Sequence, residues 1–139
     1  MTLTRFGALA ELIAQHDSLR ALMDRCHALA DKVDVGGDPA ELTHELVRLR
    51  EAFEAHNVFE ESILRPVLLA EDTHGAVRVE RMIEDHVHEH REVRQRLGSP
   101  TTAELRDVIE TLRAHLEAEE RYLLTSKVLR DDTLPLHRR

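Results

Sequence analysis

Hydrophobic residues recur along the chain in alternating steps of three and four, a spacing that places them on one face of an α-helix. Four stretches show this spacing, and they run from Leu9 to Val33, Leu42 to Val67, Val79 to Leu97 and Leu105 to Tyr122. No stretch has the alternation with a period of two that is typical of a half-buried strand. The pattern therefore predicts an all-α protein with four amphipathic helices.

Residues that start or stop helices separate the four stretches. Gly36-Gly37 should end a first helix that starts at about residue 4, and Asp38-Pro39-Ala40-Glu41 supplies an N-cap, a first-turn proline and a capping glutamate for the second. Pro66 should kink or end this second helix, because proline has no N–H to donate to the preceding turn. Gly98 should close the third helix, and Thr101-Thr102-Ala103-Glu104 is a capping box for the fourth.

Short connections between four helices favour an up-down-up-down four-helix bundle. The length of 139 residues predicts a single domain, with a core over about residues 5–125 and a polar tail over about residues 130–139.

The charge balance narrows the classes of partner. The chain has 27 acidic and 19 basic residues and a formal net charge of −8, so its field would repel nucleic acids and anionic membranes. No apolar run approaches the roughly 18 residues that span a bilayer, and the first residues do not resemble a secretion signal. We therefore expect a cytoplasmic protein, and the single cysteine, Cys26, agrees with a reducing compartment.

The histidine content is unusual, because the chain carries ten histidines. Five of them, with two glutamates, occupy positions on the hydrophobic stripes where an ordinary bundle would place Leu or Ile. Three of the four helices each offer a pair at i,i+4, a spacing that puts both side chains on the same helical face. These seven stripe residues are His16, His56, Glu60, His86, His90, His115 and Glu119.

Burial of these side chains without a metal would be costly. Each unpaired buried polar group costs about 1 to 3 kcal/mol, and the sum over the set would rival the roughly 5 to 15 kcal/mol that stabilises a domain. A bound metal turns this cost into a favourable contribution to the free energy of folding, because carboxylates and neutral imidazoles become ligands. The sequence therefore predicts a metal site.

The number and type of ligands indicate which metal this site holds. A structural zinc site takes four ligands and prefers thiolates, so seven His and Glu residues fit two ions better. A ferritin-like site needs Glu-x-x-His pairs on facing helices, but the pairs Glu41–His44 and Glu71–His74 fall at a helix start and in a loop. Imidazole with carboxylate suits iron, while zinc and manganese accept the same donors.

The combined pattern resembles the hemerythrin-like family, the HHE cation-binding domain. The resemblance rests on a lone His16, on His-x-x-x-Glu at His56, on His-x-x-x-His at His86 and on His-x-x-x-Glu at His115, and it spans about residues 5–125. It implies a non-heme di-iron centre, oxo- or hydroxo-bridged, in an all-α four-helix bundle.

Carried over residue by residue, the resemblance assigns the ligands of both irons. His86, His90 and His115 would bind one iron, and His16 and His56 the other. Glu60 and Glu119 would bridge them. One coordination position would stay open on the iron held by His16 and His56, where the family binds O₂ or a related small molecule.

The motif on the fourth helix differs from that of the oxygen carriers of the family, which have a motif similar to His-x-x-x-x-Asp there. This chain offers Glu119 at i+4 and Glu120 at i+5, and Glu119 lies on the stripe. The His-x-x-x-Glu motif is similar to that of the intracellular branch of the family, which includes iron and oxygen sensors, stress proteins and enzymes. We therefore expect a sensor or binder of O₂, hydrogen peroxide or nitric oxide in oxidative or nitrosative stress. The alternatives are a di-iron oxidoreductase that decomposes hydrogen peroxide, like a catalase, or nitric oxide, and an iron-handling protein.

Other residues near the predicted site have two interpretations. Tyr122 follows Glu119 by three residues and is the candidate catalytic side chain, as a hydrogen-bond donor or electron relay, although a core aromatic explains it equally. Apolar walls are expected from Phe53, Phe59, Ile63 and Leu112. The run from His86 to His90 also matches the His-x-x-Glu-His pattern of certain zinc peptidases, but Glu89 is displaced from the metal-facing side of a helix.

Overall fold

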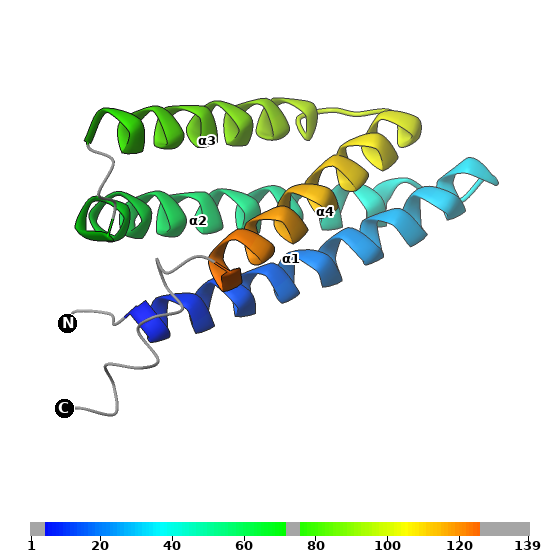
Figure 1. Cartoon of the computed structure of the whole chain (residues 1–139). Coiled ribbons are helices and arrows are strands. Elements are labelled where there is room, and N and C mark those ends of the chain that lie inside the picture. Colours follow the sequence, from blue (N-terminus) through cyan, green and yellow to red (C-terminus); the bar gives the residue numbers. More distant parts are fainter. Residues whose placement is uncertain (1–4, 72–75, 126–139) are drawn as a thin grey trace.

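The chain forms four helices in the computed structural model, which describes residues 5–71 and 76–125 (Figure 1). They are α1 (Arg5–Asp34), α2 (Ala40–Glu71), α3 (Ala76–Arg96) and α4 (Thr102–Thr125). No strand occurs among the described residues. The predicted tail over about residues 130–139 lies outside them, and the single domain over 1–139 stays a prediction.

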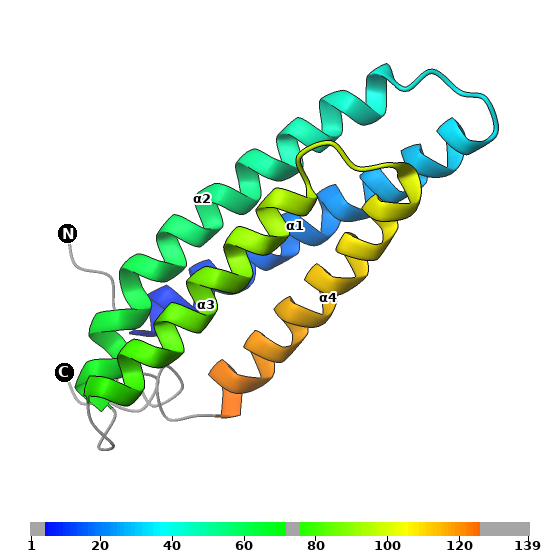
Figure 2. The ribbon, with the colours of Figure 1, turned by 90° about the horizontal axis from the view of Figure 1, so that it is seen from above.

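The helices pack as a square in which consecutive helices run in opposite directions. Helix α1 packs against α2 and α4, and α3 packs against the same two helices, so that α1 and α3 occupy one diagonal (Figures 1 and 2). The predicted up-down-up-down four-helix bundle is confirmed.

The predicted capping signals operate at the helix ends. Gly36 has a φ of 98°, a left-handed conformation that glycine adopts without steric cost, and the Gly37 N–H donates to the Lys32 carbonyl at 2.8 Å. The Asp38 carboxylate accepts a bond of 3.0 Å from the Ala40 N–H at the start of α2. Thr101 and Glu104 form the reciprocal capping box, with distances of 2.8 and 3.1 Å.

Helix α2 continues past Pro66 to Glu71, so the helix does not end at this proline, which was one of the two expected outcomes. In Figure 1 the last turns of α2 are seen nearly end-on, whereas the rest of the helix runs across the view. This change of direction agrees with the alternative expectation, a kink, because a proline removes one helical hydrogen bond and crowds the preceding turn.

The hydrophobic core fills the end of the bundle that carries the α1–α2 and α3–α4 turns. Its largest fully buried side chains include Phe53, Leu49 and Leu112 from the predicted stripes. Ile109 and Leu116 are also buried, which makes the apolar face of α4 broader than the predicted stripe. The members of this apolar end are Leu19, Met23, Cys26, Ala30, Leu49, Phe53, Val93, Leu97, Leu105, Val108, Ile109, Leu112 and Leu116.

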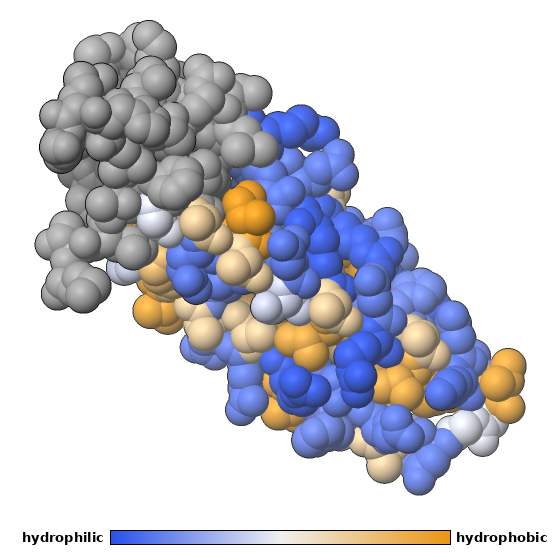
Figure 3. Space-filling view, turned by 90° about the horizontal axis from the view of Figure 1, so that it is seen from below, coloured by the Kyte–Doolittle hydropathy of each residue, from blue (hydrophilic) through white to orange (hydrophobic). Residues whose placement is uncertain are grey.

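The outer surface is mainly hydrophilic. Figure 3 shows hydrophobic residues scattered among charged and polar ones on the face seen from below. None of the helices in the described ranges is long and apolar enough to cross a membrane.

Candidate metal centre

The seven stripe residues meet next to the apolar end, from about the middle of the helices onward, and Leu12 of α1 is buried beyond them. We call this half of the bundle the polar end. Each helix contributes at least one of them, and they form two groups in which the potential ligand atoms all lie within 4.8 Å of one another. One group is His86, His90, His115 and Glu119, and the other is His16, His56, Glu60 and Glu119. Because Glu119 belongs to both groups, the two clusters are adjacent parts of one site.

Both glutamates lie between the two sets of histidines. Glu119 places Oε1 3.2 Å from His16 Nε2 and Oε2 3.1 Å from His115 Nε2. Glu60 places Oε2 3.6 Å from His56 Nε2 and Oε1 3.2 Å from His90 Nε2. Each carboxylate thus turns one oxygen toward the α1 and α2 histidines and the other toward the α3 and α4 histidines. This is the orientation that two bridging carboxylates need.

The fifth histidine, His86, faces both carboxylates. Its Nε2 contacts Glu60 and lies 2.8 Å from Glu119 Oε2. The rings of His86, His90 and His115 are close neighbours, with centroids 4.1 to 5.4 Å apart. Three imidazoles and two carboxylate oxygens therefore converge on the α3 and α4 side of the site.

Several buried atoms at the centre have no hydrogen-bond partner. They include Nε2 of His16, His56, His90 and His115 and both carboxylate oxygens of Glu119. Buried polar atoms are nearly always hydrogen-bonded in native proteins, and each exception costs about 1 to 3 kcal/mol. These nitrogen and oxygen atoms are potential metal ligands that lie close to one another, so the residues fit a pair of bound cations.

The same contacts shift the pKa values of the metal-free site. Burial opposes the charge on Glu119, but the close imidazoles of His115, His16 and His86 outweigh it and lower the pKa of Glu119 to about 2. Burial likewise disfavours a charged His86, but Glu119 and Glu60 outweigh it and raise the pKa of His86 to about 10. The proton on His86 thus occupies a lone pair that a cation would take.

On the α1 and α2 side, the outer nitrogen of each histidine bonds to the neighbouring helix. His16 Nδ1–H donates to Glu120 Oε2 at 2.7 Å, and Arg20 holds the same carboxylate. His56 Nδ1–H donates to Gln15 Oε1, also at 2.7 Å. A proton held on Nδ1 leaves the Nε2 lone pair directed at the centre of the bundle.

Two histidines on the α3 and α4 side also place Nδ1 next to a side chain of the neighbouring helix. His90 Nδ1 lies 3.2 Å from Glu61 Oε2, and His115 Nδ1 lies 3.1 Å from Glu89 Oε2. Glu89 therefore faces away from the centre, as the helical geometry predicts, and this disfavours the peptidase interpretation of the run from His86 to His90. The four outer contacts form a ring, because each one crosses a different side of the four-helix square.

The sequence analysis names neither Gln15 nor Glu61. It considers Glu89 only within the peptidase pattern and Glu120 only as a possible ligand. Each of the four is the immediate chain neighbour of a stripe residue. A neighbour is turned by about 100° around the helix, which places it at the seam with an adjacent helix rather than in the centre. A polar residue directly beside a predicted ligand is the signal that finds such outer partners.

The predicted walls and the candidate catalytic residue have different outcomes. Phe53 is fully buried, with its ring centroid 5.7 Å from that of His90 in an edge-on arrangement, and Leu112 is also buried. Phe59 and Ile63 are half-buried. The side chain of Tyr122 lies outside the described part of the structure, so its role stays a prediction.

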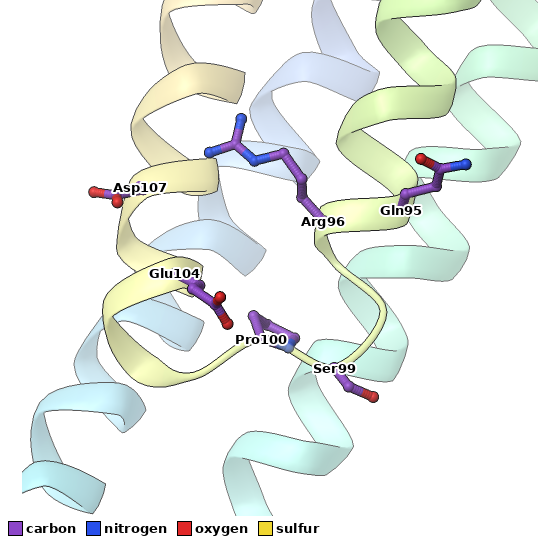
Figure 4. Close-up of a pocket in the computed structure, with 6 residues that line it drawn as sticks. All are labelled: Gln95, Arg96, Ser99, Pro100, Glu104 and Asp107. Carbon is purple, nitrogen blue, oxygen red and sulfur yellow. The ribbon is translucent and has the colours of Figure 1, made fainter.

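Two of the hollows on the surface of the described residues differ in their relation to the site. One lies at the α3–α4 turn, where Pro100 and Glu104 face each other (Figure 4), and none of the stripe residues lines it. The other is a groove between α1 and α2, and its lining includes Gln15 and His56. Of these two hollows, the second reaches the site.

The comparisons with known proteins agree with this geometry. A family model described as the hemerythrin HHE cation-binding domain matches residues 7–126, a range that contains all seven stripe residues. Comparisons with curated proteins and with solved structures give no match. The chain belongs to the hemerythrin HHE cation-binding domain family.

Proposed function

We propose that this protein is a non-heme di-iron protein that binds O₂, hydrogen peroxide or nitric oxide at one open iron position. It acts in the cytosol as a small-molecule sensor or binder in oxidative or nitrosative stress. The observation that carries the proposal is the placement of Glu60 and Glu119, each with one oxygen toward either set of histidines. Two carboxylates in this orientation match a pair of ions that share both of them.

The histidines divide unequally between the two positions. His86, His90 and His115 would hold one ion, whereas His16 and His56 would hold the other, which leaves that position one ligand short. When bound, the two irons supply the electrons and the vacant coordination site that a small oxidant or nitric oxide requires. The five imidazoles and two carboxylates are a donor set that suits iron.

The surroundings of the site favour small molecules. His16 is completely buried, Phe53 packs edge-on against His90, and Leu112 is buried in the adjoining core, so bulk water has little access from the apolar end. The α1–α2 groove is lined in part by Gln15 and His56 and so reaches this part of the site from the surface. A diatomic molecule or a peroxide matches an entrance of this kind.

The test is anaerobic reduction of the iron-loaded protein, followed by separate additions of O₂, hydrogen peroxide and nitric oxide. We expect a stable absorption change with at least one of the three and no continuing consumption. The change should disappear in His56→Ala and persist in His88→Ala, because His88 is an exposed histidine of α3 that lies outside both ligand groups.

The same experiment separates the alternatives. Continuing decomposition of hydrogen peroxide or nitric oxide would replace the binder with a di-iron oxidoreductase. Iron release without response to any of the three molecules would indicate iron handling. A response that survives His56→Ala would contradict the assignment of the open position.

A further inference from the structure

The ring of outer contacts carries different charges on its two sides. On the α3 and α4 side, Glu61 and Glu89 face His90 and His115 with carboxylates. On the α1 and α2 side, His56 meets the neutral amide of Gln15. His16 meets Glu120, whose carboxylate is shared with the Arg20 guanidinium at 2.8 and 2.9 Å.

This difference changes the strength of the histidines as ligands. A carboxylate that accepts the Nδ1–H bond pushes electron density into the ring and makes Nε2 a stronger donor, and an amide does so much less. Loss of such an outer partner typically lowers metal affinity about 10- to 100-fold. Gln15 therefore leaves His56 the weaker kind of ligand.

The orientation of the Gln15 amide is fixed by a second contact. Its Nε2 donates to Glu11 Oε2 at 2.9 Å, one turn earlier on α1, so its oxygen must face His56. The reversed amide would present a donor to His56 Nδ1 and force the ring proton onto Nε2. Glu11 thus holds Gln15 in the one orientation that leaves His56 able to bind a cation.

The same contacts lie beside open solvent. The lining of the α1–α2 groove includes Glu11, Gln15, Ser18 and His56. Glu11, Gln15 and Ser18 belong to neither ligand group, so they can be replaced without removing a ligand.

We infer that the outer ring makes the two ion positions unequal, and that Gln15 is a positioning residue which keeps the position of His16 and His56 the last to fill and the first to empty. This inference rests on the proposed two-iron function and adds an order of loading to it. The protein would pass between a one-ion and a two-ion form while the position of His86, His90 and His115 stays filled.

The test is an anaerobic titration of the metal-free full-length protein with iron(II) against a coloured competing chelator. The wild type should bind two ions in two steps, with the second at least about ten-fold weaker. The decisive variant is the exchange Glu11→Gln with Gln15→Glu, which keeps the net charge and moves the carboxylate next to His56. We expect its second step to tighten about ten-fold and its first step to stay unchanged.

Two further variants complete the design. Ser18→Glu places a carboxylate in the same groove without replacing the contact of His56, and it should leave both steps as in the wild type. Glu61→Gln should weaken the first step about ten-fold and spare the second. Equal effects of the exchange on both steps, or no effect, would overturn the inference while the two-ion site stands. Binding of fewer than two ions by the wild type would instead overturn the proposed function itself.

Discussion

The two ends of the bundle use the same helical stripes for opposite purposes. Toward the α1–α2 and α3–α4 turns, the inward positions are Leu, Met, Phe and Val and pack into a continuous apolar core. One to two turns further along, the same positions are His and Glu, and several of their buried atoms have no hydrogen-bond partner. One end holds the helices together by burial of apolar surface, and the other brings ligands together at a cost that bound cations relieve.

The comparison shows how a small bundle can maintain a preformed metal site. A fully buried Leu contributes about 1.5 to 3 kcal/mol relative to an exposed one, so the apolar end can hold the four helices in register. Outer contacts such as Glu120 with His16 and Gln15 with His56 then orient the rings. The polar end therefore depends on the apolar end for its geometry, whereas the apolar end does not depend on the metal.

The largest effect is expected from Glu119→Ala, which should abolish the binding of both ions. Glu119 is the residue shared by the two ligand groups, so its loss removes one oxygen from each position. The metal content of the purified variant, measured by elemental analysis, should fall close to zero while the helical content stays unchanged. Glu117→Ala is the matched control, because Glu117 is an exposed glutamate of the same helix. Retention of two ions by Glu119→Ala would show that the two positions do not share this ligand.

A substitution in the apolar end should lower stability and leave metal binding unchanged. Leu49→Ala removes a fully buried side chain from the core and should lower the free energy of unfolding by about 2 to 5 kcal/mol. The loss should be similar with and without metal, and the folded fraction should keep its full metal content. Chemical unfolding in chelator and in iron(II) measures both values. Metal loss from folded Leu49→Ala would mean that the two ends are not separable.

A smaller effect is expected from pH on the metal-free protein. The pKa of His86 is raised from 6.5 to about 10, so its contribution to stability is complete below pH 6.5 and lost as the pH rises toward 10. The pKa of Glu119 is lowered from 4.5 to about 2, so its contribution is present above pH 4.5 and lost as the pH falls toward 2. The unfolding midpoint in chelator should therefore be highest between pH 4.5 and pH 6.5. His86→Gln should reduce the fall of the midpoint as the pH rises toward 10. An unchanged alkaline slope in this variant would contradict the assignment.

Much of the fold could be predicted from the sequence, because helix periodicity and capping are local signals. The glycine pair at Gly36 and the capping box at Thr101 and Glu104 mark helix ends to within a few residues. Pro66 was harder to interpret, because whether a helix bends or ends there depends on packing rather than on the residue alone. The convergence of the seven stripe residues follows from the same periodicity.

The outer ring could not be predicted in the same way. Gln15, Glu61 and Glu89 lie off the stripes, and their importance depends on which helices are neighbours and how these are rotated. Which of Glu119 and Glu120 is the ligand also depends on how α4 is rotated relative to its neighbours. Glu119 points between the histidines, whereas Glu120 lies at the seam with α1, where His16 and Arg20 hold it.

The most direct test of the central claim is the iron and zinc content per chain of protein produced with ample iron, measured for the wild type and Glu119→Ala. We expect two irons per wild-type chain and none in the variant, because one carboxylate serves both positions. Zinc alone, a single ion, or no metal in the wild type would contradict the claim that the polar end of the bundle is a di-iron site.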